Sequence, residues 1–192
     1  MQTLKRKHPD GCGAMPVMLV SAVLGCVLGT LAYCLLCSEN PAAPTALYKA
    51  MSAFGSLSSV YIDSFCTVSA FLLALFLLGF CSVAQPAEIC VPAAFGLGSG
   101  MIMSDCYASS AFPGQAAYPA LTAVFFAGSA LCICAAACES VKMSSQLMAH
   151  VMSPVSSEGM LDRLRLYCGK FLAAELICAV LSGVRTLAEH LR

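Results

Sequence analysis

Cysteine is the residue type that most readily suggests chemistry in this chain, which has 13 cysteines among 192 residues. Cys34 and Cys37 have the spacing of a redox or zinc-binding pair. The two residues between them are leucines, no histidine is near, and a thiolate would be costly within an apolar run. Most of the cysteines lie in or at the ends of such runs. We therefore interpret them as small hydrophobic residues and predict no metal site and no cofactor.

The sequence contains no recognisable set of catalytic residues. It has neither a nucleophile elbow nor the H-E-x-x-H zinc pattern, and the three histidines fall in tails or polar connections. The acidic residues expected outside the membrane are isolated from one another, as solvated loop charges are: Glu39, Asp63, Asp105 and Glu189. We expect a protein that is not an enzyme.

Glu175 is the most anomalous residue, because it lies near the middle of an apolar run. A carboxyl group at the centre of a bilayer costs roughly 2.5 to 3.5 kcal/mol on insertion scales, so it should face a cavity, another helix or a cation. One interpretation is a structural carboxyl, protonated or paired with Lys170 or with a polar group of the preceding span. The other is ion or proton handling. Lys170 itself is close enough to the end of the run to extend to the interface.

Two pairs of glycines have the four-residue spacing that puts them on one helix face. Gly25 and Gly29 form one pair, and Gly96 and Gly100 form the other. Small residues at this spacing let two helix backbones approach closely within lipid, so we predict that both faces pack against helices of this molecule or of a partner. A phosphate-binding loop is the alternative for the second pair, but the Lys-Ser/Thr that should follow is missing.

The elements that carry these residues are membrane helices. The chain is 59% hydrophobic and only 10% charged, whereas soluble domains have about 25% charged residues. The formal net charge is zero, and Lys5-Arg6-Lys7 is too short a basic run to indicate a nucleic-acid partner. The sequence therefore predicts an integral membrane protein in contact with lipid.

Apolar runs predict an all-α, polytopic fold with about five transmembrane helices in a single membrane domain, residues 15–192, after a cytoplasmic tail, residues 1–14. Two amphipathic helices at the interface are also expected, one over Ala46–Val60 and one continuing the fourth span beyond Cys138. The predicted spans are residues 15–37, 64–83, 87–104, 116–138 and 164–184.

Lysine and arginine predict the orientation of the chain. With a cytoplasmic N-terminus, seven of these residues are inside and three are outside, which agrees with the excess of positive charge on cytoplasmic segments. Five spans then place the C-terminus outside. We expect a multi-pass protein of the cell membrane.

Several short motifs occur in a recognisable order. GCVLGTL lies in the first span and CVPAAFGLGSGM in the third. A loop with Pro113 and Gln115 follows, then Pro119, and ESVKMSSQL continues the fourth span. The arrangement resembles the stage II sporulation protein M family of small bacterial membrane proteins over about Met15–Leu191. The loop departs from that family's L-P-Q-N-like signature, since Gly114-Gln115 stands where Gln-Asn is more usual.

The resemblance implies a membrane scaffold of engulfment during sporulation. Such a scaffold would localise peptidoglycan-degrading proteins, proteins D and P of the same stage, at the septal membrane of the mother cell. Small-residue helix faces for assembly and the lack of catalytic groups agree with this role. The alternative from the residues is a small transport component with an ion or substrate path near Glu175, formed in part by a helix broken at Pro92 and Gly96–Gly100.

Overall fold

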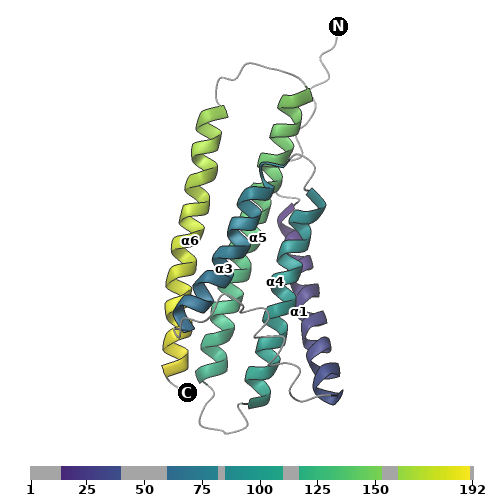
Figure 1. Ribbon diagram of the computed structural model, residues 1–192, viewed down its shortest axis with the longest axis vertical. Helices are drawn as coiled ribbons and strands as arrows, with labels where there is room; N and C mark the ends of the chain where they lie inside the picture. The colour runs from purple at the N-terminus through teal and green to yellow at the C-terminus, as the bar shows by residue number, and fades with distance from the viewer. Residues whose placement is uncertain (1–13, 40–59, 82–84, 110–116, 153–159, 191–192) are drawn as a thin grey trace.

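A computed structural model describes residues 14–39, 60–81, 85–109, 117–152 and 160–190 of the chain. In these ranges the chain forms five α-helices and no strand, which confirms the predicted all-α fold. The helices are labelled as in Figure 1. They are α1 (Ala14–Glu39), α3 (Val60–Leu78), α4 (Gln85–Ser109), α5 (Ala117–Met152) and α6 (Met160–His190).

The five helices run along the long axis of an elongated bundle and alternate in direction (Figure 1). In that view α1, α4 and α6 run downward, and α3 and α5 run upward. Helices α6 and α1 form the two outer edges, whereas α5 contacts each of the other four helices. The bundle is therefore organised around α5.

Four of the helices are long and apolar enough to cross a membrane, so the chain is a multi-pass membrane protein that contacts lipid through apolar helices. These four candidate spans overlap the first four predicted ones. The fifth predicted span lies within α6, which is not one of the four, and its crossing stays a prediction. The candidate spans are Ala14–Leu36, Val60–Leu78, Gln85–Ala108 and Tyr118–Ala149.

Helices α4 and α5 differ from the third and fourth predicted spans in continuity and in length. Helix α4 is continuous through Pro92 and the glycines after it, so the predicted break in this helix is wrong. A proline inside a membrane helix is tolerated when neighbouring helices pack around it and satisfy the backbone groups that it frees. Pro92 is fully buried in this way. The polar continuation beyond Cys138 is confirmed, because α5 is a single helix of 36 residues, about 54 Å long.

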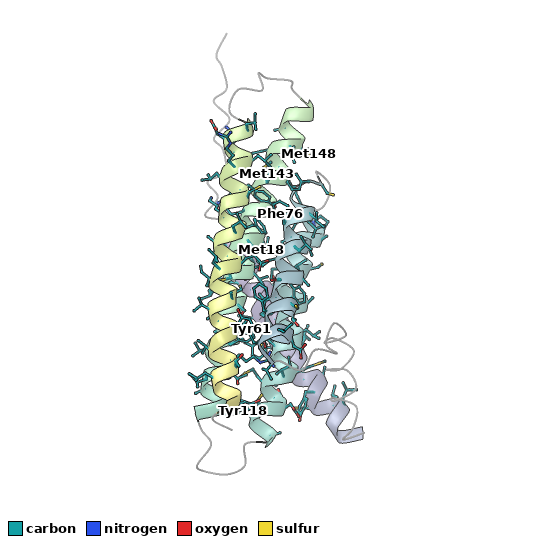
Figure 2. The ribbon with its side chains drawn as sticks, turned by 60° about the vertical axis from the view of Figure 1, so that its left-hand side comes forward. Met18, Tyr61, Phe76, Tyr118, Met143 and Met148 are labelled. Atoms are coloured by element: carbon teal, nitrogen blue, oxygen red, sulfur yellow. The ribbon has the colours of Figure 1, made fainter. Side chains whose placement is uncertain are left out.

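The greater length of α5 and α6 makes one end of the bundle uneven. Their upper parts extend past the ends of α1, α3 and α4 (Figure 1). Figure 2 shows Met148 of α5 in this protruding part and Tyr118 near the opposite end. The end of α3 and the start of α4 are thus flanked by protein at a level where they would otherwise meet water or headgroups.

Helices α1 and α4 pack with their backbones in direct contact. A methyl group added at Gly25 or Gly29 would collide with the backbone carbonyl oxygen of Ala93 or Leu97. Additions at Gly96 and Gly100 would collide with the α1 backbone in return. The two predicted glycine faces therefore pack against each other within one molecule.

Several predicted features lie outside the described residues. These include the tail over residues 1–13, the surface helix up to Ser59, and the loop with Pro113 and Gln115. Pro119 is described and lies in the first turn of α5, where a missing N–H costs no helical hydrogen bond.

Candidate functional site: a buried carboxyl at the end of α3

The C-terminal end of α3 presents a group of backbone oxygens that can accept hydrogen bonds from outside the helix. The chain closes the helix with a tight turn, in which Gly79 N donates to Leu75 O at 3.0 Å and Cys81 N donates to Leu78 O at 2.8 Å. The last carbonyl groups of a helix carry its partial negative charge and need donors from elsewhere. At this end of α3 the donors come from side chains of α5 and α6.

Three hydroxyl groups donate to these oxygens. Ser140 Oγ of α5 lies 2.8 Å from Leu75 O, and Ser144 Oγ lies 2.8 Å from Cys81 O. Tyr167 of α6 donates from its hydroxyl to Phe76 O at 3.0 Å. The end of α3 is thus capped by two other helices in addition to the turn of its own chain.

A carboxyl group joins this cluster from α4. Glu88 lies in the first turn of α4 and is completely buried. Its Oε1 lies 2.7 Å from Ser140 Oγ, whereas its Oε2 has no hydrogen-bond partner among the described residues. Ser140 therefore connects α5 to α3 and α4 at one point.

Aromatic rings and a glycine enclose the cluster on the α6 side. The Tyr167 ring stacks on Phe76, with centroids 5.3 Å apart, and also contacts Phe80 and Phe171. A methyl group added at Gly79 would collide with the Tyr167 hydroxyl. Glycine at this position is what lets the hydroxyl reach the end of α3.

Glu175, the residue singled out from the sequence, lies elsewhere in the bundle. It is half-buried in α6 and accepts a hydrogen bond from Ser69 Oγ of α3 at 2.6 Å. The expected pairing with Lys170 or with a polar group of the fourth span is wrong, because the partner comes from α3. The antiparallel packing of α3 and α6 brings these two residues to the same level.

Lys170 binds a different carboxylate. Its Nζ lies 2.6 Å from Glu139 Oε2 of α5, and Lys142 Nζ lies 2.7 Å from the other oxygen of Glu139. The Lys170 and Lys142 side chains are 45% and 43% exposed, so this network lies at the surface of the bundle. It joins α5 to α6 one residue before Ser140.

Several of the described cysteines are packing residues in the bundle interior, whereas others lie on its outer surface. Those with described side chains are free thiols, and Cys134 and Cys178 are fully buried. Cys138 Sγ contacts Met15 Sδ at 3.6 Å, which joins α5 to α1. Within the described part of the chain, no group of three or more His, Cys, Asp or Glu residues could hold a metal ion.

Glu88 and Ser140 are the site residues that sequence reasoning missed. Glu88 lies at the edge of a predicted span, where a charged residue is ordinary, and Ser140 lies in the polar continuation of the fourth span. A signal was present, because Ile133, Ala137, Ser140 and Ser144 follow the three- and four-residue spacing of one helix face. All four are buried, so the two serines continue an apolar face toward the bundle interior.

In chemical terms the cluster offers one carboxyl, three hydroxyl groups and several backbone oxygens in a buried setting. Such a set can hold a proton and fix helix ends, and it contains no activated nucleophile. No protein-family model, no curated protein and no solved structure matches this chain.

Proposed function

We propose that this protein is a non-enzymatic membrane scaffold, and that its outer helices bind the membrane helices of partner proteins. The observation that supports this most is the exposure of α1. Only 17% of its candidate span is buried, against 50% of that of α5. Large apolar side chains such as Val20, Leu24 and Leu31 are more than half exposed. Helix α1 is attached along a narrow glycine stripe and presents a long apolar face.

The polar contacts between helices also support a structural role. The Glu175–Ser69 contact joins α6 to α3, and the Lys170–Glu139 contact joins α6 to α5. Each therefore holds two helices together.

The resemblance to the stage II sporulation protein M family specifies the proposal further. On that basis the scaffold acts in engulfment at the septal membrane of the mother cell and localises peptidoglycan-degrading partners. The partners would carry out the chemistry, which agrees with the absence of a recognisable catalytic set in the sequence.

Deleting the gene in its host tests this role. After sporulation is induced, membrane-dye microscopy should show a mother-cell membrane that fails to migrate around the forespore. A complemented strain is the control and should engulf normally. Normal engulfment in the deletion strain, with no second copy to compensate, would refute the engulfment role.

Site-specific photo-crosslinking tests the proposed partner surface. A crosslinking amino acid at Leu24 or Leu31, which are 57% and 54% exposed, should capture a membrane protein identified as a wall hydrolase by mass spectrometry. The matched control is Met18 on the inner face of α1, which is 2% exposed and should crosslink only within the molecule. Equal patterns from both faces would contradict a partner surface on α1.

A transport component is the second candidate, supported by the half-buried Glu175 between α3 and α6. Helix α4 is continuous, so a path would have to follow α3 and α6 instead. Glu175→Gln separates the two functions: a coupled transporter loses activity while its fold is retained, whereas a scaffold keeps its function if the bond to Ser69 is preserved.

A further inference from the structure

The hydrogen atoms available around Glu88 show which state of its carboxyl fits the structure. Ser140 Oγ lies within hydrogen-bond distance of two oxygens, Leu75 O at 2.8 Å and Glu88 Oε1 at 2.7 Å. A serine hydroxyl carries one hydrogen and a backbone carbonyl carries none. An ionised Glu88 would leave one of the two short contacts without a hydrogen.

We propose that Glu88 is a proton-binding site, whose carboxylic acid donates to Ser140 Oγ while Ser140 donates to Leu75 O. The added proton supplies the hydrogen that the second contact requires. It forms a chain of two hydrogen bonds that runs from α4 through α5 to the end of α3. This inference does not depend on the scaffold role.

No positive charge is placed to balance an ionised Glu88 among the contacts that the structure records. The lysine amines described on α5 and α6, those of Lys142 and Lys170, are each bound to Glu139. Tyr167 faces the cluster from α6 and donates to backbone oxygens. The residues packed around Glu88 therefore offer oxygen atoms and hydroxyl groups rather than a counter-charge.

The two helix ends at this site have opposite effects on a negative charge. Glu88 is in the first turn of α4, where a helix favours negative charge, but the C-terminal end of α3 beside it disfavours one. A carboxylate that served as a helix cap would accept backbone N–H groups of its own first turn. Glu88 Oε2 has no such partner among the described residues. The hydrogen count at Ser140 therefore decides for the neutral acid.

Infrared spectroscopy of the full-length protein in lipid nanodiscs tests the proposal directly. With ¹³C-labelled glutamate, wild type should show the C=O stretching band of a protonated carboxylic acid near neutral pH. Glu88→Gln should lose this band, and Glu175→Gln, which removes the half-buried carboxyl group bound to Ser69, should retain it. Ser140→Ala should shift the band to higher frequency, because the acid loses its acceptor.

The pH dependence of stability provides the second measurement. If the folded chain holds a proton that the unfolded chain releases near neutral pH, raising the pH favours unfolding. One proton changes the unfolding constant roughly tenfold per pH unit. This dependence should be present in wild type and in Glu175→Gln and should be lost in Glu88→Gln, whose amide donates to Ser140 without titrating.

Two outcomes would overturn the inference. The first is a protonated-acid band that persists unchanged in Glu88→Gln. The second is stabilisation of wild type, but not of Glu88→Gln, by Na⁺ or K⁺ relative to choline at equal ionic strength, which would identify a cation site instead. If Glu88→Gln fails to fold, the labelled wild type still decides, because an ionised Glu88 leaves no protonated band that responds to Ser140→Ala.

Discussion

One hydroxyl oxygen, that of Ser140, joins three helices. It contacts a backbone oxygen of α3 and a carboxyl oxygen of α4, and it belongs to α5. A hydroxyl group at such a junction is difficult to replace, since its loss takes one hydrogen-bond partner from each of two oxygen atoms, of which Leu75 O also accepts from Gly79 N. At the scale of single residues, the stability of this bundle therefore depends on a few hydroxyl groups.

The first prediction compares Ser140→Ala with Ser144→Ala. Removing the Ser140 hydroxyl should destabilise the protein by roughly 1 to 3 kcal/mol, the usual cost of an unsatisfied buried polar group. Ser144→Ala should cost less, because Ser144 contacts only Cys81 O. Unfolding by SDS titration, followed by circular dichroism, measures both. Equal losses would contradict a special role for Ser140.

The second prediction concerns Gly79 and Tyr167, whose close contact leaves no room for a methyl group. Gly79→Ala should cost roughly 1 to 3 kcal/mol by overpacking. Adding Tyr167→Phe removes the atom that collides, so the double variant should be more stable than the sum of the single effects predicts. Strict additivity in the same SDS titration would show that the two residues do not interact.

Of the two buried or half-buried carboxyl groups, the sequence points to Glu175 but not to Glu88. Glu175 stands out because a carboxyl within an apolar run is unusual, but its partner Ser69 is 106 residues away and is set by the packing of α3 on α6. Glu88 was missed because a carboxyl at the edge of a span normally reaches water. It is buried here only because α5 and α6 extend past the start of α4, and the length of neighbouring helices does not show in the residues around Glu88.

At the scale of elements, the contact between α1 and α4 is the closest in the molecule. The glycine spacing predicted a close helix pair, and the structure identifies the two helices as partners. Spacing alone could not decide between a partner in the same molecule and one in another. The structure shows that the partner is in the same molecule, because the glycines of α1 contact the backbone of α4 and the glycines of α4 contact the backbone of α1.

The third prediction tests this contact with matched glycines. Gly25→Ala and Gly100→Ala place a methyl group against backbone, which cannot move aside as a side chain can, and should cost roughly 1 to 3 kcal/mol each. Gly169 and Gly183 of α6 have nothing within 4 Å of an added methyl group. Their replacement by alanine should be neutral or should stabilise the helix by up to about 1 kcal/mol.

Thermal unfolding of the four variants in one detergent provides the comparison. The expected order is Gly25→Ala and Gly100→Ala below wild type, with Gly169→Ala and Gly183→Ala at or above it. Similar stability for all four would mean that α1 and α4 do not pack through their glycines in the membrane.

At the scale of the whole molecule, the direction of α6 determines at which end of the bundle the last helix finishes. In Figure 1, α1 begins toward the same end of the bundle as α6, and α6 runs to the opposite end. Lys142, Lys170, Arg163 and Arg165 belong to the upper parts of α5 and α6, so positive charge gathers at the end where α1 starts. This distribution agrees with the predicted orientation, in which that end is cytoplasmic.

The fourth prediction is therefore a difference between two reporter fusions. A reporter placed after Met152, the end of α5, should be cytoplasmic, and one placed after Arg192 should be outside the cell. Paired alkaline phosphatase and green fluorescent protein fusions distinguish the two sides. If both positions are cytoplasmic, α6 lies on one side of the membrane and the protein has four spans.

The uneven burial of the helices also bears on how this protein diverges over evolutionary time. A side chain that faces lipid can be exchanged for almost any other apolar side chain, so the outer face of α1 is free to drift. Residues that meet backbone or a buried hydroxyl have few substitutes. Descendants of a common ancestor would then lose overall identity quickly while retaining a sparse pattern of glycines, serines and one glutamate. Such a pattern, Gly25, Gly29, Gly79, Glu88, Gly96, Gly100 and Ser140, is a more durable signature of kinship than the apolar runs that surround it.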